Sequence, residues 1–326
     1  MRLDLVTAAY RGGSTYVRAV PRPVADLTAR VLSRTAATMS KERRTLVARH
    51  LRRARPELAG RSLDRAVDAT FDSYARYWVE SFRLPGTSVA ALDAGLSVDG
   101  YEHVVAGLAA GNGVILVLPH LGGWEWAGFW LTRVMGLQVT VVVEPLEPPE
   151  LFEFFADFRA KLGFHIVPLG PKAAPAVLRA LRDNHVVCLL ADRDIAGDGV
   201  EVDFFGERTT LPAGPVTLGL RTGAPILPTA VYFDGPVHHA RVMAPLPIER
   251  NGRLRADVAV ATQTLAGRLE GLIREAPEQW HLQQPNWPSD YEVLEAMGKP
   301  HPRPEFGPSA RPGPGSSSDP RPGDEG

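Results

Sequence analysis

The histidine at position 120 is the residue best placed in this sequence to act as a general base. It follows the apolar run Val114–Leu118 and a proline, and two glycines, a tryptophan and the acid Glu125 come after it. A histidine at the carboxyl end of a buried strand can take a proton from a hydroxyl at neutral pH. With nine histidines and 37 acidic residues in the chain, such a spacing arises by chance about once, so the prediction depends on the surrounding motif.

Acidic residues follow two further apolar runs, where the predicted strands end. Glu144 comes directly after Val141–Val143, and Asp192 comes directly after Leu189–Ala191. The carboxyl ends of parallel strands meet at one edge of a sheet, so we expect both acids near His120. A carboxylate that bonds to one ring nitrogen leaves the other nitrogen free to act as a base. A loop that carries only a surface ion pair is the alternative for the second acid.

The sequence offers no protein nucleophile for this base. It has no Gly-x-Ser-x-Gly motif, and its single cysteine, Cys188, lies in an apolar strand pattern typical of a small buried hydrophobe. The group that His120 deprotonates is therefore expected to be a hydroxyl of the substrate. Backbone N–H groups near Gly122 and Gly123, where a helix starts, are expected to stabilise the oxyanion. We expect no metal, since His238 and its histidine neighbour have no matching acid nearby in the sequence.

The rest of the chain supplies the elements that must position these groups. From about residue 100, apolar runs of strand length alternate with helical segments. This alternation predicts an α/β fold with a central, mostly parallel sheet flanked by helices on both faces. The predicted strands are 114–118, 138–143, 164–168, 186–191, 200–205, 225–233 and 239–243. The predicted helices are 100–110, 123–135, 148–162, 173–183, 212–222 and 256–274.

The amino-terminal part, residues 1–83, is predicted to be helical, with helices at 24–38, 41–54 and 63–82. Residues 1–65 hold 15 Lys/Arg and 5 Asp/Glu, although the whole chain has a net charge of −1. Many of these basic residues lie among apolar ones at helical spacing: Lys41, Arg43, Arg44, Arg49, Arg52, Arg53 and Arg55. A basic amphipathic helix is typical of a segment on an anionic membrane surface. A solvated helix face, or a helix docked on the acidic remainder, is the alternative.

Composition and length bound the remaining classes. The chain has 326 residues, 44% of them hydrophobic and 22% charged, and no apolar stretch reaches the ~20 residues of a membrane span. The first 30 residues do not resemble a signal peptide, and a single cysteine indicates a reducing compartment. Nucleic acid is not an expected partner, because the basic segment lacks interleaved aromatic residues. The predicted division is a basic, membrane-surface helical segment at 1–83 packed on an α/β core at 84–298, then a disordered tail at 299–326 with eight prolines.

Half of the six tryptophans lie within seven residues, at positions 124, 126 and 130. Their helical spacing is typical of core packing. The functional interpretation is the wall of a hydrophobic groove that takes an acyl chain, and both interpretations can hold together. We therefore expect such a groove beside the sheet, with Trp124 in contact with the substrate.

Several separate motifs, in this order, resemble those of the bacterial acyltransferases that act on glycolipids, which include lipid A acyltransferases and phosphatidylinositol mannoside acyltransferases. The resemblance covers roughly residues 60–290 and includes the family's His-x4-Asp/Glu motif at His120–Glu125. It also includes the runs Ala191–Asp194, Val200–Gly206 and Leu220–Ala224. A late run, Trp280–Trp287, is similar to the mannoside branch rather than to the lipid A branch.

The resemblance implies transfer of a long-chain acyl group, expected to be palmitoyl, from acyl-CoA to a mannose hydroxyl of a phosphatidylinositol mannoside. His120 would be the general base and Asp192 its partner, where the mannoside enzymes carry a glutamate. Asp192 is one methylene shorter, which implies a closer backbone or a looser contact. Glu125 is the competing partner, because the motif acid can serve this relay in related acyltransferases.

The same resemblance implies the remaining partners and binding residues. Glu144 and Arg159 look like the supporting pair of the site, and Arg221 is a candidate for the CoA phosphates. Acyl-CoA is a co-substrate, no cofactor or metal is implied, and the protein is expected at the cytoplasmic face of the inner membrane as a peripheral protein. Acyl transfer to another lipid acceptor and non-catalytic binding of an acyl chain stay open. A hydrolase is disfavoured, since no nucleophile or metal set is present.

Overall fold

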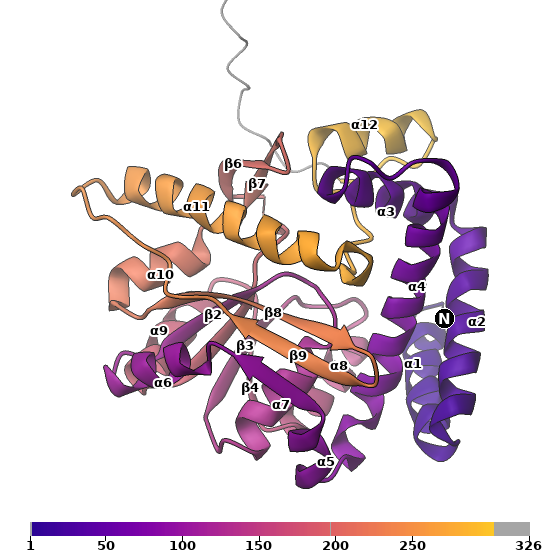
Figure 1. The fold of residues 1–326 in the computed structure, drawn as a ribbon, viewed down its shortest axis with the longest axis horizontal. Coiled ribbons are helices and arrows are strands. Elements are labelled where there is room, and N and C mark those ends of the chain that lie inside the picture. The colour runs from indigo at the N-terminus through magenta and orange to yellow at the C-terminus, as the bar shows by residue number, and fades with distance from the viewer. Residues whose placement is uncertain (1, 196, 303–326) are drawn as a thin grey trace, which may run out of the picture.

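A seven-stranded sheet forms the centre of the protein (Figure 1). The structure is a computed structural model that describes residues 2–195 and 197–302. The strand order is β1-β9-β8-β2-β5-β3-β4, and every neighbouring pair is parallel except β8 and β9. The strands are β1 (Leu96–Asp99), β2 (Val114–Leu118), β3 (Val139–Val143), β4 (Phe164–Pro168), β5 (Val186–Leu190), β8 (Ile226–Asp234) and β9 (Val237–Val242). The predicted α/β class with a mostly parallel sheet is confirmed.

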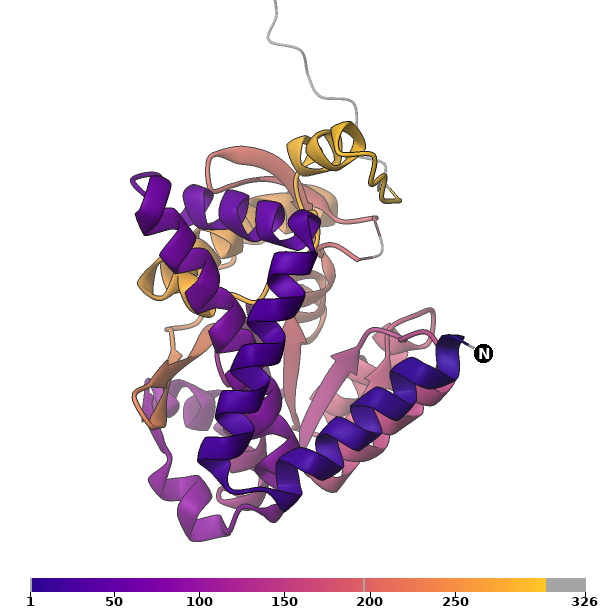
Figure 2. The same ribbon diagram turned by 90° about the vertical axis from the view of Figure 1, so that its right-hand side faces the viewer.

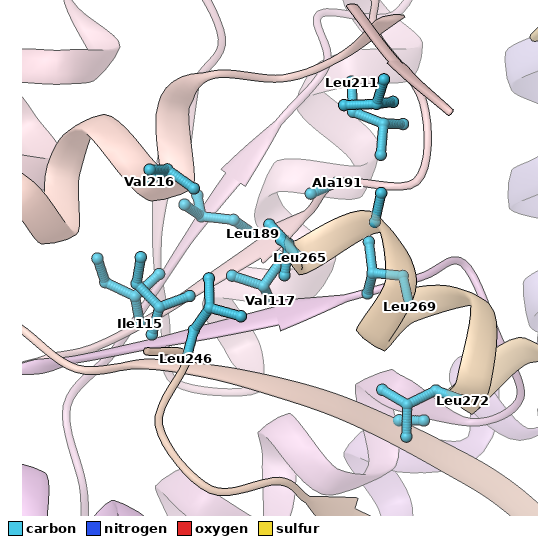
Figure 3. Close-up of a cluster of buried hydrophobic side chains, with 14 of the residues drawn as sticks. Ile115, Val117, Leu189, Ala191, Leu211, Val216, Leu246, Leu265, Leu269 and Leu272 are labelled. Atoms are coloured by element: carbon cyan, nitrogen blue, oxygen red, sulfur yellow. The ribbon is translucent and has the colours of Figure 1, made fainter. Parts of the chain in front are cut away.

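Helices cover both faces of this sheet, because its central strand β2 is apolar and buried along its whole length. Ile115 and Val117 belong to the cluster of Figure 3, whereas Leu116 and Leu118 belong to a second cluster on the opposite face. The first face is covered by α9 (Ala173–Arg182), α10 (Gly214–Thr222) and α11 (Leu254–Glu275). The second is covered by α5 (Val89–Ala94), α6 (Tyr101–Ala109), α7 (Trp124–Arg133) and α8 (Pro149–Lys161). Burial of each large apolar side chain contributes about 1.5–3 kcal/mol to the stability of the fold, so these clusters fix the strand ends that carry the site.

Several short elements were not predicted from the sequence. β1 is a four-residue edge strand whose side chains alternate between half-buried and exposed, so its apolar signal is weak. β7 (Glu207–Leu211) pairs antiparallel with β6 (Val200–Phe204) in a separate two-stranded ribbon. Phe205 lies in the turn of this ribbon with a φ of 55°. Helices α5 and α12 (Pro288–Ala296) were also not predicted.

The first four helices of the chain form a layer along one side of the core (Figures 1 and 2). They are α1 (Arg2–Ala19), α2 (Arg22–Met39), α3 (Lys41–Ala54) and α4 (Gly60–Arg83). One apolar cluster joins α1, α2 and α4 to α8, and another joins α2, α3 and α4. The amino-terminal helices are thus packed on the core.

The basic helix α3 docks on the protein with its apolar side, where Leu46, Val47 and Leu51 are buried. Three of its arginines form ion pairs inside the chain: Arg44 with Asp68, Arg49 with Asp290, and Arg53 with Glu207 and Asp290. The docked alternative therefore describes α3, and its apolar side is not free to contact a membrane.

Helix α2 instead exposes a row of large apolar side chains. Its members are Val24, Leu27, Val31, Leu32 and Met39, which we call the α2 apolar row. Among residues 2–195 and 197–302, no helix is both long enough and apolar enough to cross a membrane. The predicted disordered tail lies outside the described residues from position 303 onward.

Candidate active site

The sheet order brings the predicted strand-end groups to one edge. β5 lies between β2 and β3, and all three strands run in the same direction. Leu118 is opposite Leu190 in the register of β2 with β5. His120 and Asp192, each two residues further on, therefore face one another. Glu144 directly follows β3 at the same edge.

His120 and Asp192 form a hydrogen-bonded pair. Nδ1 of His120 lies 2.7 Å from Oδ1 of Asp192, and the backbone N–H of His120 donates to Oδ2 at 3.0 Å. Asp192 is fully buried, whereas the His120 side chain is 33% exposed. No described residue forms a hydrogen bond with Nε2 of His120. The pair thus fixes one ring nitrogen and leaves the other open to a substrate.

Hydrogen bonds from three residues hold Asp192 in place. Nε1 of Trp280 donates to Oδ2 at 2.7 Å, and Nδ2 of Asn286 donates to the backbone carbonyl of Asp192 at 3.0 Å. Burial alone would raise the pKa of the Asp192 carboxyl, but the charge and hydrogen bonds of His120, with the indole of Trp280, hold this pKa below its ordinary value. Trp280 and Asn286 received no role from the sequence, although both stand in the run that resembles the mannoside branch.

A backbone pairing holds that late segment against the His120 loop. Leu121 and Trp280 form an isolated antiparallel bridge. The N–H of His281 donates to the carbonyl of His120 at 2.7 Å, and the N–H of Gly122 donates to the carbonyl of Gln279 at 2.9 Å. Gln279 ends the 3-10 helix η2 (Pro277–Gln279). The site is therefore built from the β2–α7 loop, the end of β5 and the segment after η2.

The N–H groups of Gly122 and Gly123 are not free to stabilise an oxyanion, which corrects their expected role. The first donates to Gln279, as described, and the second donates to the carbonyl of Val231 at 3.2 Å. Gly122 has a φ of +59°, and a Cβ there would lie 2.0 Å from the carbonyl oxygen of Val231, so the loop requires glycine. The N–H groups that begin α7, those of Trp124 and Glu125, have no hydrogen-bond partner among the described residues.

Glu125 pairs with Arg159 and not with His120. The Nε of Arg159 donates to Oε1 of Glu125 at 2.9 Å, and Nη2 of Arg159 lies 2.7 Å from the same oxygen in a salt bridge. Oε2 of Glu125 is buried and has no hydrogen-bond partner within the described residues. Asp192 is thus the acid beside the base, and Glu125 joins α7 to α8.

Glu144 and Arg159 do not form the predicted pair. Glu144 is exposed and forms a salt bridge with Arg193, with 3.1 Å between Nη2 and Oε2. Arg159 is turned toward Glu125 and is only 14% exposed. Glu144 therefore lies at the surface, beyond the end of β3. The alternative that the loop after β5 carries a surface ion pair thus holds for Arg193, but not for Asp192.

Arg221 lies at the amino ends of the strands, whereas His120 lies at their carboxyl ends. It stands in the last turn of α10 and lines a hollow of about 250 Å³. Asn112, which precedes β2, lines the same hollow, so it lies at the amino ends of the strands. The structure does not bring Arg221 to the site, and its position does not support the expected contact with CoA phosphates.

Two of the three clustered tryptophans are held in the core. The indole N–H of Trp126 donates to the carbonyl of Leu92 at 3.1 Å, and that of Trp130 donates to the carboxylate of Asp93 at 2.8 Å. Both bonds join α7 to α5. The core interpretation of these two side chains is therefore the one that the contacts support.

The predicted hydrophobic groove would lie beside Trp124 and the His120 loop. Trp124 is half-buried, with its ring 5.9 Å from that of Tyr77 and 5.5 Å from the guanidinium of Arg159. The cavity that Gly123, Trp126 and Tyr77 line measures about 10 Å³, which is room for one water molecule. This cavity by itself is too small to hold an acyl chain.

Proton transfer at the open nitrogen of His120 is the chemistry that this arrangement supports. Burial raises the pKa of the Cys188 thiol to about 12, so this residue is not a thiolate nucleophile at neutral pH. The part of the chain that the structure describes holds no group of three or more His, Cys, Asp or Glu side chains placed to bind a metal.

The chain belongs to the family of bacterial lipid A biosynthesis acyltransferases, which it matches over residues 3–289. It is 42% identical, over 232 residues, to a phosphatidylinositol mannoside acyltransferase of Mycobacterium tuberculosis (strain CDC 1551 / Oshkosh), covering 70% of this chain and 72% of that protein. The protein of the same name from Mycolicibacterium smegmatis is 41% identical over 230 residues, 70% of this chain and 74% of that one. The predicted family is thereby confirmed, and the protein is an acyltransferase of this family.

Proposed function

We propose that this protein transfers a long-chain acyl group, palmitoyl by resemblance to the family, from acyl-CoA to a mannose hydroxyl of a phosphatidylinositol mannoside. The pair of His120 and Asp192, with Nε2 of the histidine open, is the observation that carries the proposal. The names of the two similar mycobacterial proteins support the choice of acceptor. No cofactor or metal takes part in the proposed reaction.

The reaction needs one base and two substrates. Nε2 of His120 takes the proton of the sugar hydroxyl while its oxygen attacks the thioester carbonyl. This general-base catalysis by His120 contributes ~10²–10⁴ in rate, and Asp192 stabilises the imidazolium that forms. The tetrahedral intermediate expels the CoA thiolate, which takes the proton back from His120, so the products are an ester and free CoA. The open N–H groups of Trp124 and Glu125 would stabilise the oxyanion.

An aromatic cluster near the site would take the acyl chain. Tyr10 of α1, Trp78 of α4 and Phe155 of α8 contact one another, with ring centroids 5.3–5.5 Å apart. Trp78 also contacts Tyr77, which continues to Trp124 beside the His120 loop. Because these rings are in contact, a chain would enter by parting α1 from α4 and α8.

Attachment to an anionic membrane surface is proposed through the amino-terminal helices. The α2 apolar row would enter the interface, and exposed basic side chains such as Lys41, Arg43 and Arg52 would lie above anionic headgroups. Each such charge contributes about 1 kcal/mol close to the surface. A peripheral position at the cytoplasmic face of the inner membrane would give the site both acyl-CoA and the glycolipid.

The test is an acylation assay with purified protein, palmitoyl-CoA and phosphatidylinositol mannoside in anionic vesicles. We expect mass spectrometry to show an added palmitoyl group and thiol titration to show an equal amount of free CoA. His120→Ala should lower this rate by ~10²–10⁴ without unfolding the protein. The matched control is His165→Ala, which removes an exposed histidine of β4 and should stay within about twofold.

Four outcomes would contradict the proposal. A folded protein that makes no acylated lipid would refute acyl transfer to this acceptor, and a product formed only from another glycolipid would replace the acceptor. CoA release without acylated lipid would indicate thioester hydrolysis. Acyl-chain binding with no CoA release, unchanged in His120→Ala, would indicate a non-catalytic binding protein.

A further inference from the structure

Trp280 donates a hydrogen bond to the Asp192 carboxylate, as His120 does. Within residues 2–195 and 197–302, three N–H groups bond to this carboxylate, the ring Nδ1 and backbone N–H of His120 and the indole Nε1 of Trp280. An indole N–H donates and cannot accept, so its hydrogen bond favours the ionised form of the carboxylate. By holding Oδ2, it also turns Oδ1 toward the imidazole.

The surroundings of Trp280 fix its ring. The side chain is 2% exposed, and its ring lies 5.6 Å from those of both His50 and Phe205. Phe205 has a positive φ, which is uncommon for a residue other than glycine and is found where surrounding structure holds it. Its N–H donates to Glu270 of α11 at 2.6 Å. The ribbon turn and the Leu121 bridge thus support Trp280 from two sides.

Other titratable groups near the pair of His120 and Asp192 come from several segments of the chain. His281, next to Trp280, has its pKa lowered to about 3 by burial and by the charge of His120. His50 of α3 has both ring nitrogens occupied, by a backbone carbonyl and by Asp290. The salt bridge of Arg193 and Glu144 lies beyond the end of β5. None of these groups bonds to the Asp192 carboxylate in the described residues, so the indole contact can be tested by itself.

We propose that Trp280 is a positioning residue that orients Asp192 and limits how strongly this carboxylate holds the proton on His120. The indole N–H takes up part of the negative charge on Oδ2. Without it, the charge would concentrate at Oδ1, the imidazolium would be favoured, and less of the enzyme would carry the free base at a given pH. This inference rests on the proposed general-base role of His120.

The test compares Trp280→Phe with Trp287→Phe. Trp287 is a matched control, because it is fully buried in the same aromatic group and its indole N–H donates at 3.1 Å to the backbone carbonyl of Phe204. Trp280→Phe should lower kcat by about tenfold or more. It should also move the acid limb of the kcat/KM profile toward higher pH, and it should leave the KM for acyl-CoA within about twofold. Trp287→Phe should lose stability without moving that limb.

A double-mutant cycle separates positioning from general packing. In an Asp192→Asn background, Trp280→Phe should cost less than threefold, because the carboxylate through which it acts is gone. If Trp280→Phe does not fold, 3-benzothienylalanine at position 280 keeps the ring shape and replaces the N–H by sulfur. Coincident pH profiles for wild type and the position-280 variant, or an undiminished cost in the Asp192→Asn background, would overturn the proposal.

A readout without turnover keeps this inference apart from the proposed function. The imidazole carbon signals of His120, followed by NMR against pH, should show a higher midpoint in the position-280 variant than in wild type. That shift in a protein with no acyl transfer would leave the inference standing and refute the proposed function. Acyl transfer with an unchanged midpoint would refute the inference alone.

Discussion

Asp192 and Asp290 are both fully buried and each holds a histidine, yet the two pairs differ at the far side of the ring. Nδ1 of His120 forms a hydrogen bond with Asp192, and the other ring nitrogen has no partner among the described residues. In His50, one ring nitrogen forms a hydrogen bond with Asp290 at 3.1 Å, and the other forms one with the carbonyl of Leu282 at 3.0 Å. The first ring is one-third exposed, whereas the second is buried.

An open ring nitrogen, and not the acid, is therefore the feature that separates the two pairs. Asp290 also accepts hydrogen bonds from Arg49 and from the backbone N–H groups of Asn286 and Trp287, so it ties α3 to the segment before α12. Burial alone would raise the pKa of Asp290, but His50 and the nearby arginines hold it well below its ordinary value. The geometry of the first pair suits the proposed proton transfer, and that of the second pair suits attachment.

The sharpest test of the proposed catalytic pair is Asp192→Asn. A neutral amide cannot stabilise the imidazolium and disfavours the tautomer with a free Nε2, so turnover should fall by roughly 10²–10⁴. Initial rates of CoA release at saturating substrates measure this, with the melting temperature as the check on folding. A loss below tenfold would show that the acid is dispensable.

The corresponding change in the structural pair, Asp290→Asn, should act on stability. It leaves Arg49, Arg53 and His50 around a site without its negative charge, and breaking a buried ion pair costs about 3–5 kcal/mol. Urea unfolding measures the free energy, and turnover per folded molecule should fall less than tenfold. Equal losses of activity in both Asn variants would erase the distinction between the pairs.

His281 gives a pH-dependent prediction. Its folded pKa of about 3 lies below the value of about 6.5 for an unfolded histidine, because burial and the charge of His120 disfavour its proton. Between these values the unfolded chain binds more protons, so the free energy of unfolding falls as the pH drops, by up to about 1.4 kcal/mol per pH unit. His281→Gln should reduce this slope in urea titrations between pH 6.5 and 4. An unchanged slope would show that the ring is solvated or already charged.

The smallest effect is expected for the exposed pair of Arg44 and Asp68. Asp68 is 43% exposed, and its hydrogen bond of 2.7 Å to Arg44 is screened by solvent. Asp68→Asn should therefore change the free energy of unfolding by less than about 1 kcal/mol and leave the acylation rate alone. A loss as large as that of Asp290→Asn would show that α3 is held mainly by its exposed charges.

The strand ends could be predicted from the sequence because they combine a local signal with a rule of topology. Apolar runs before His120 and Asp192 indicate buried strands, and parallel order then brings their ends together. The partner of Arg159 could not be predicted in this way, because Glu125 and Glu144 are both acids at the same edge and only packing decides between them. The N–H groups of Gly122 and Gly123 are occupied by carbonyls of η2 and of strand β8, which are distant in the sequence.

The pairing of the His120 loop with the segment around Trp280 has a consequence for synthesis of the protein. A nascent chain that has emerged only as far as α11 already contains the histidine and Asp192, but it lacks the indole and the backbone partners of residues 279–281. The ribosome must therefore finish almost the whole folded region before the histidine is held in place. In the proposed reaction, acyl-CoA would thus meet a competent enzyme only after residues 279–281 have emerged, and shorter nascent chains would leave the thioester intact.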